Sequence, residues 1–148
     1  MKHEILQKSA HGVSQNTYHL IWTTKYRYPL FKEKFYRQTA LNAIILAAKR
    51  QGIRIFEIEV MEDHVHLFTG LPRNMPVTRA FQLLKGYSSF QIRRICPHLK
   101  RYKAVWSSFT FSRTVGSVTG GVIEHYIKES NTRGQYGEQL SLKQFGRA

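Results

Sequence analysis

The chain has few features that would cross-link it or carry it into a membrane. Its single cysteine, Cys96, excludes an internal disulfide and any zinc site that needs several thiolates. No apolar run approaches the roughly 20 residues that cross a bilayer. The first residues also lack the apolar segment and cleavage site of a secretory signal. We therefore expect a cytoplasmic protein with no membrane partner.

Negative charge is also scarce. The 9 Asp and Glu residues stand against 23 Lys and Arg, which leaves a net charge of +14. Solubility needs far less charge than this, so the excess indicates a polyanionic partner, with nucleic acid as the first candidate. An anionic membrane surface is less favoured, because no basic amphipathic helix with a bulky apolar face is evident.

The length of 148 residues suits a single domain. We predict one domain over residues 1–148, in which 1–15 form an N-terminal arm and 132–148 a C-terminal tail. Aromatic residues make up 13% of the chain and hydrophobic residues 42%, which favours a folded domain over a disordered polymer.

Hydrophobic periodicity divides the remaining sequence into strands and helices. The expected strands are 17–23, 53–60, 64–70 and 105–115, and the expected helices are 32–51, 78–95 and 118–130. The first helix has apolar positions at Phe35, Leu41, Ile44, Ile45 and Ala48, and Gly52 caps its C-terminus. The stretch 105–115 is interpreted as one strand or as two short ones.

The order β-α-β-β-α-β is that of the split βαβ, or ferredoxin-like, α+β fold. It predicts a four- to five-stranded antiparallel sheet with the helices on one face. The other face is then free to bind a ligand, and the tyrosine-bearing helix at 118–130 is an addition at the C-terminus.

Two histidines stand at alternate positions in Asp63-His64-Val65-His66. Because side chains alternate along a strand, both imidazoles project to the same side, about 7 Å apart along the chain. Such a pair can chelate one cation, although two ligands do not complete a site and an exposed or hydrogen-bonded pair is the plainer interpretation. No usable spacing is found for the other histidines considered, His3, His11, His19 and His98.

The last predicted helix carries Tyr126. A lone tyrosine on an amphipathic helix is ordinarily a packing residue. A phenolic oxygen can nevertheless attack a phosphodiester when a divalent cation stabilises the charge on the leaving 3′ oxygen. The positive charge, the histidine pair and a tyrosine helix that follows Gly120-Gly121 are consistent as parts of one nucleic-acid-cleaving site.

Five stretches carry a resemblance to a known family. They are Trp22-Thr-Thr-Lys-Tyr-Arg27, Val60-Met-Glu-Asp-His-Val-His66, Leu84-Lys-Gly-Tyr-Ser88, Val105-Trp-Ser and the Tyr126 helix. Over about 17–131 the chain resembles the insertion-sequence 200/605 family of single-tyrosine HUH transposases. The histidine stretch with its preceding Met-Glu-Asp is the most specific of the five.

The resemblance implies an enzyme that cleaves and rejoins single-stranded DNA at the ends of its element. In this family Tyr126 would attack the scissile phosphate and leave a 5′-phosphotyrosine and a free 3′-OH. His64 and His66 would bind Mg²⁺ or Mn²⁺, and no nucleotide cofactor would be needed. The implied partners are single-stranded DNA with hairpin ends and a second copy of the chain, in a homodimer whose active sites are shared between subunits.

One position departs from the family pattern. The family usually supplies a third metal ligand, a glutamine, four residues after the tyrosine, where this chain has Ser130. Serine is a weak, neutral ligand for a hard cation. We therefore favour Glu129 or a bridging water as the third ligand.

The positive charge also indicates where DNA binds. Single-strand binders commonly place aromatic rings between cations. The residues that we favour as phosphate or base contacts are Lys25, Arg27, Lys85, Tyr87, Arg93 and Arg94. Any one of the charged residues taken alone is more simply a solvated surface charge.

Two alternatives remain open from the sequence. The first is a non-catalytic single-stranded nucleic-acid-binding protein on the same scaffold, although the chain lacks the aromatic motif of an RNA-recognition domain. The second is a domesticated relative of the transposases that processes repeat hairpins for its host. Its chemistry would be the same.

Overall fold

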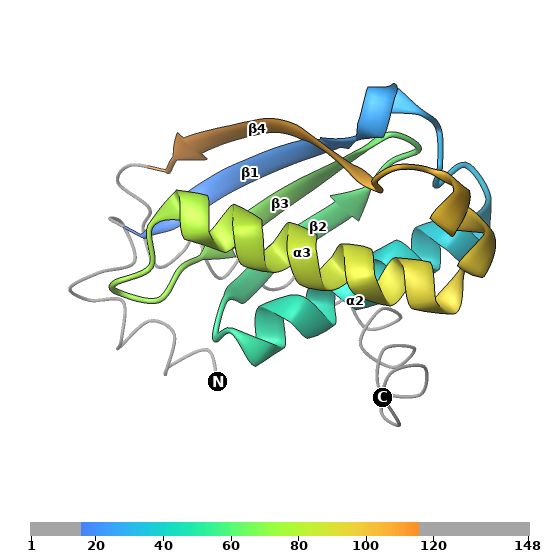
Figure 1. Ribbon diagram of the computed structural model, residues 1–148. Helices are drawn as coiled ribbons and strands as arrows, with labels where there is room; N and C mark the ends of the chain where they lie inside the picture. Colours follow the sequence, from blue (N-terminus) through green and yellow to red (C-terminus); the bar gives the residue numbers. More distant parts are fainter. Residues whose placement is uncertain (1–15, 116–148) are drawn as a thin grey trace.

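The computed structural model describes residues 16–115, which form a sheet with two helices packed against one of its faces (Figure 1). The elements are β1 (Thr17–Thr24), η1 (Lys25–Arg27), α2 (Lys34–Arg50), β2 (Arg54–Val60), β3 (His64–Gly70), α3 (Val77–Ile95), η2 (Pro97–Arg101) and β4 (Trp106–Thr114).

The strand order in the sheet is β2-β3-β1-β4, and every neighbouring pair is antiparallel. β1 and β2, which α2 connects, run parallel to each other with β3 between them, and this is the split βαβ arrangement. The ferredoxin-like α+β fold expected from the sequence is thus confirmed, with 105–115 forming one strand. The predicted helix at 118–130 lies outside the described residues.

Local sequence signals place the helix ends. α2 gives way to Gly52, whose φ of +68° is easily adopted by a residue without a Cβ. α3 begins directly after Pro76 and ends at Ile95, two residues before Pro97. Among the helices within 16–115, none has the length and apolar character needed to cross a membrane.

The position expected for Phe35 was wrong. The sequence pattern put this ring on the buried face of α2, yet it is 56% exposed. Nine residues at about 100° each place Phe35 on the opposite side of the helix from Ile44, which is fully buried.

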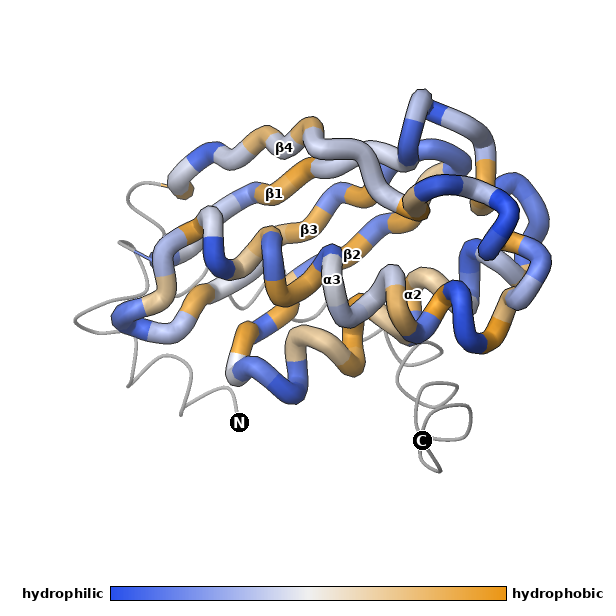
Figure 2. The backbone as a smooth tube through the Cα atoms, viewed as in Figure 1, coloured by the Kyte–Doolittle hydropathy of each residue, from blue (hydrophilic) through white to orange (hydrophobic). Residues whose placement is uncertain are grey.

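The core lies between the sheet and the helices, and apolar residues recur along the strands and on both helices (Figure 2). Alternation in the strands gives the sheet its inner face: Leu20 and Trp22 of β1 are fully buried. The Trp22 ring meets Phe81 of α3 and Trp106 of β4 edge-on, with centroids 6.0 and 5.9 Å apart. The opposite face of the sheet is left without a helix from the described part of the chain.

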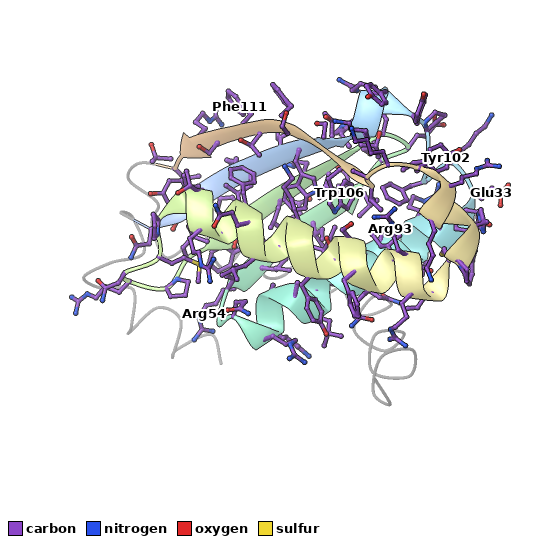
Figure 3. The ribbon with its side chains drawn as sticks, viewed as in Figure 1. Glu33, Arg54, Arg93, Tyr102, Trp106 and Phe111 are labelled. Atoms are coloured by element: carbon purple, nitrogen blue, oxygen red, sulfur yellow. The ribbon has the colours of Figure 1, made fainter. Side chains whose placement is uncertain are left out.

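A buried hydrogen bond joins α3 to β4. Trp106 Nε1 donates to Ser88 Oγ at 3.0 Å, and Ser88 is fully buried (Figure 3 labels Trp106).

Ser88→Ala should lower the free energy of unfolding by about 1–3 kcal/mol, because the indole N–H loses its acceptor. Urea denaturation measures the change. Ser108→Ala, on the exposed part of β4, is the control. Its free energy of unfolding should stay within about 0.5 kcal/mol of wild type. Equal stabilities for the two variants would contradict the prediction.

Candidate metal and nucleic-acid site

Both histidines of the pair lie on the face of the sheet opposite α2 and α3, which we call the open face. In β3, Val65 and Leu67 are fully buried in the core, so the alternate residues His64 and His66 point the other way. The register with β1 sets His64 opposite Thr23 and His66 opposite Ile21. The two imidazoles therefore share one side of the strand, where both are half-buried.

Asp63 orients the first imidazole. Its Oδ1 accepts a hydrogen bond from His64 Nδ1 at 2.9 Å, and its Oδ2 accepts one from Arg27 Nε at 3.0 Å. These bonds from His64 and Arg27 hold the pKa of Asp63 below its usual range. The ionised carboxylate can only accept, so the neutral imidazole of His64 carries its proton on Nδ1 and has its lone pair on Nε2. Metal-binding histidines are commonly held in this way by a carboxylate.

A third imidazole, from β1, contacts the second. His19 Nδ1 lies 3.2 Å from His66 Nε2. Burial, followed by the neighbouring charges of His66 and Arg113, lowers the pKa of His19. The sequence analysis missed this residue because no spacing in one segment shows it: only the pairing of β1 with β3 brings the two rings together.

The histidines fit a divalent cation in part. The lone pair of His64 Nε2 is already oriented by Asp63, and His66 shares its face. Within residues 16–115, however, no three His, Cys, Asp or Glu side chains converge closely enough to hold a metal ion. Glu59 of β2 lies opposite His66 in the strand register and is exposed. A hard cation would need oxygen ligands beyond the two imidazoles.

A tyrosine cluster, formed by Tyr26, Tyr28 and Tyr102, lies at the turn that follows β1. The rings of Tyr26 and Tyr28 are 5.6 Å apart, as are those of Tyr28 and Tyr102. Lys25 Nζ lies 5.1 Å from the Tyr26 ring centroid. The ion pair of Arg27 with Asp63, at 3.0 Å, ties this cluster to the histidine site.

The turn that carries Tyr26 and Tyr28 has a strained backbone. Tyr26 and Arg27 both have φ of +56°, a region that costs most side chains about 1–3 kcal/mol each. Several bonds hold the turn in place: Thr24 Oγ1 donates to the carbonyl of Tyr28 at 2.6 Å, and the Lys25 N–H donates to that of Val105 at 2.9 Å. Such strain is typical of functional segments, and the Tyr26 side chain on this turn is 68% exposed.

Two of the predicted DNA contacts line a separate groove on α3. The groove has a volume of about 620 Å³ and is lined by Gly86, Ser89, Phe90, Arg93, Arg94 and Lys100. Arg93 donates to the carbonyl of Tyr102 at 2.8 Å, and Figure 3 shows both residues at the same end of the molecule. Because α3 covers one face of the sheet and the histidines occupy the other, this groove is not part of the histidine site.

The remaining two predicted contacts are used within the fold. Lys85 is half-buried and its Nζ donates to the carbonyl of Ser107 at 2.7 Å, while burial lowers its pKa. The Tyr87 ring is covered by the Arg50 guanidinium, 5.0 Å from its centroid. These contacts join α3 to β4 and to the end of α2.

The family model described as "Transposase IS200 like" matches residues 12–130. The chain belongs to the IS200-like transposase family. This IS200-like transposase is similar to the transposase for insertion sequence element IS200 of Salmonella typhimurium, with 31% identity over 131 residues that cover 84% of this chain and 83% of the relative. It is also 28% identical over 132 residues to the ISDra2 transposase TnpA of Deinococcus radiodurans, which covers 86% of this chain and 93% of the relative.

Solved structures resemble the IS200-like transposase in fold. A crystal structure from Deinococcus radiodurans R1, described as that of a transposase, matches with a TM-score of 0.62 and 29% identity, and covers 76% of this chain and 88% of that chain. The structure of a REP-associated tyrosine transposase bound to a REP hairpin matches with a TM-score of 0.53 at 17% identity, and covers 84% and 71%. At that identity the second match shows a common fold.

Three residues assigned to the transposase site from sequence lie outside the described residues. They are the nucleophile candidate Tyr126 and the ligand candidates Glu129 and Ser130. Within 16–115 the structure brings His64, His66, Asp63 and Arg27 together. Lys85 and the Arg93–Arg94 pair lie elsewhere on the fold.

Proposed function

We propose that this IS200-like transposase cleaves and rejoins single-stranded DNA through a covalent link to Tyr126. The observation that carries the proposal is the His64–Asp63–Arg27 network on the open face of the sheet. It orients a lone pair on His64 Nε2 and connects it to a cationic, aromatic turn. A binding protein that only stacks bases has no need of an imidazole held in this way.

The reaction conserves the phosphodiester bond energy. The phenolic oxygen of Tyr126 forms a bond to the scissile phosphorus as the bond to the 3′ oxygen breaks. The phenolic proton passes to water, and the 3′ oxygen takes a proton and leaves as a 3′-OH. Attack by a 3′-OH on the 5′-phosphotyrosine reverses these steps and restores the phenol, so joining needs no nucleotide cofactor.

His64 and His66 would hold Mg²⁺ or Mn²⁺. When bound, such a cation polarises a non-bridging phosphate oxygen and stabilises charge on the leaving 3′ oxygen. Further oxygen ligands would come from Glu129, from Ser130 or from water, and Glu129 is the better ligand of the two side chains for a hard cation.

The working unit in this proposal is a homodimer in which the Tyr126 helix of one subunit completes the site of the other. The described sheet supports this with an open edge: β4 is the last strand in the order and carries Phe109 and Phe111, 54% and 49% exposed. Phe111 projects from β4 on the side away from the helices (Figure 3). An exposed apolar edge strand is a ready surface for a second copy.

DNA with hairpin ends is the proposed substrate. Its single strand would run over the tyrosine cluster, where stacking on Tyr26 and Tyr28 is flanked by Lys25 and Arg27. The groove with Arg93 and Arg94 would contact phosphates on the other face, and a protein of the same fold has been solved with a REP hairpin bound. A REP-like substrate would make this chain a domesticated relative with the same chemistry.

Tyr26→Leu tests the stacking surface. Leucine keeps the bulk but not the ring, so the affinity for a short single strand should fall about 5- to 150-fold, the equivalent of 1–3 kcal/mol. Fluorescence anisotropy with a labelled oligonucleotide measures it. Phe35→Leu removes another exposed ring, on α2, and should bind like wild type. An unchanged affinity in Tyr26→Leu would exclude stacking on this ring.

The reaction itself is tested with single-stranded DNA from the flanks of the gene, incubated with Mn²⁺ or with chelator and separated on a denaturing gel. With a 3′ label the proposal expects a protein–DNA adduct, and with a 5′ label a free fragment that polymerase can extend. Both products should need Mn²⁺. Tight binding without any adduct would favour the non-catalytic nucleic-acid-binding alternative.

A further inference from the structure

His19 is held in a defined place on the open face. By register it lies opposite Phe68 of β3, and the two rings are 4.8 Å apart. Phe68 is fully buried and packs on Phe56 at 5.1 Å. From this apolar support the His19 ring reaches diagonally to His66, where the two imidazoles are inclined by only 12° with centroids 5.2 Å apart.

We infer that His19 is a positioning residue, which holds the His66 ring for cation binding by accepting at its Nδ1 a hydrogen bond from His66 Nε2. The inference rests on the proposed use of a divalent cation by His64 and His66. The contact is 3.2 Å long, which is within hydrogen-bond range. Its role for His66 parallels the role of Asp63 for His64.

The proton in this bond determines what His66 offers to a cation. One of the two facing nitrogens must donate and the other accept. If His19 donated, it would occupy the lone pair of His66 Nε2. The bond and a bound cation coexist only when His66 donates from Nε2 and keeps its lone pair on Nδ1. The hydrogen bond made by one ring nitrogen thus fixes which nitrogen binds the metal.

Direct ligation by His19 is the alternative to positioning. Two nitrogens that bind one cation also lie about 3 Å apart, so the separation of 3.2 Å between His19 Nδ1 and His66 Nε2 is compatible with both roles. Within residues 16–115, however, no three His, Cys, Asp or Glu side chains are grouped closely enough to hold a metal ion, the three imidazoles included. The number of nitrogens bound to Mn²⁺ decides between the two roles.

Two variants separate positioning from packing. His19→Phe keeps a ring against Phe68 and removes both nitrogens, whereas His19→Asn keeps a polar group near the place of Nδ1. His98→Phe is the matched control, because His98 is exposed on η2 and its ring contacts Tyr36. The full chain is titrated with Mn²⁺ and free Mn²⁺ is read by electron paramagnetic resonance. Thermal unfolding checks that each variant is folded.

We expect His19→Phe to weaken Mn²⁺ binding by about tenfold or more, the usual effect of losing an outer partner of a metal ligand. His19→Asn should recover most of the affinity, and His98→Phe should match wild type. Long-range ¹H–¹⁵N correlation spectra of the metal-free protein should show His66 protonated on Nε2. The inference is overturned by unchanged affinity in His19→Phe or by a His66 protonated on Nδ1.

Pulsed measurements on ¹⁵N-histidine protein give the number of nitrogens bound to Mn²⁺. Two in both wild type and His19→Phe support positioning, and three in wild type would make His19 a ligand and overturn it. Failure of the proposed function looks different: wild type and His66→Ala would then bind Mn²⁺ equally weakly. Tight binding that is lost in His66→Ala but kept in His19→Phe rejects only the role of His19.

Discussion

Tyr126→Phe should form no covalent complex with single-stranded DNA and should bind the same strand as tightly as wild type. The substitution removes one oxygen, the proposed nucleophile, and leaves the ring. Strand cleavage should therefore fall by more than about 10⁴-fold, as expected when an enzyme loses the atom that forms its intermediate. Denaturing gels with 3′-labelled DNA measure the adduct, and anisotropy measures binding.

Tyr36→Phe is the matched control for this experiment. Tyr36 lies on α2, in the helical layer, where its ring contacts Phe35 and His98. The open face with its histidines is on the other side of the sheet. Wild-type cleavage in Tyr36→Phe, together with none in Tyr126→Phe, assigns the nucleophile. An adduct that persists in Tyr126→Phe would mean that another residue attacks the phosphate.

Mixing two inactive variants tests whether sites are shared between subunits. In a shared-site homodimer, a Tyr126→Phe subunit supplies intact histidines and a His66→Ala subunit supplies an intact tyrosine. Random pairing makes half of the dimers hybrid, each with one intact site of two, so roughly a quarter of wild-type cleavage should return. If each subunit contained its own complete site, the mixture would stay inactive.

His64→Ala and His66→Ala should each weaken Mn²⁺ binding by more than about 100-fold. Removal of a residue that only hydrogen-bonds a metal ligand lowers the affinity by about 10- to 100-fold, and removal of the ligand itself should cost more. Cleavage should fall with binding at any fixed Mn²⁺ concentration. Calorimetric or paramagnetic titration measures the affinity, and gels measure cleavage. High Mn²⁺ should restore part of the activity, because the remaining ligands and the tyrosine are intact.

His98→Ala provides the comparison for both histidine variants. It removes an imidazole of the same chain from η2 without touching the open face. Mn²⁺ affinity and cleavage should remain at wild-type levels. Full cleavage by His64→Ala in the presence of chelator would contradict metal use altogether, whereas equal losses in all three variants would indicate non-specific coordination by surface histidines.

The fold was largely predictable because its signals are local. Each signal depends only on residues nearby in the sequence. Examples are the alternation at Leu20 and Trp22, the Gly52 cap of α2 and Pro97 after α3. The misplacement of Phe35 has the same origin. Phe35, in the first turn, adds to the apolar composition of α2 but does not follow the angular spacing of the buried residues. Only the angle around the helix axis decides which side chains pack against the core.

The histidine pair could also be predicted, since spacing of i and i+2 on a strand is enough to give a shared face. Lys85 shows the limit of such reasoning. Its charge and its place in a recognisable stretch predicted DNA contact, which stays a prediction, but they did not reveal that its Nζ donates to the carbonyl of Ser107, 22 residues away in sequence. Charge is visible in a sequence, but the acceptor that a charged group finds is not.

The sequence by itself determined the order of elements over residues 16–115 and the family, and its charge indicated a polyanionic partner, because charge, periodicity and short motifs are properties of neighbouring residues. Only the tertiary structure decided what surrounds the histidines. Asp63 adjoins His64 in the chain, but its pairing with Arg27 and the contact of His19 with His66 span 36 and 47 residues. Such contacts depend on strand register and on a turn with two left-handed residues, and both follow from packing of the whole sheet.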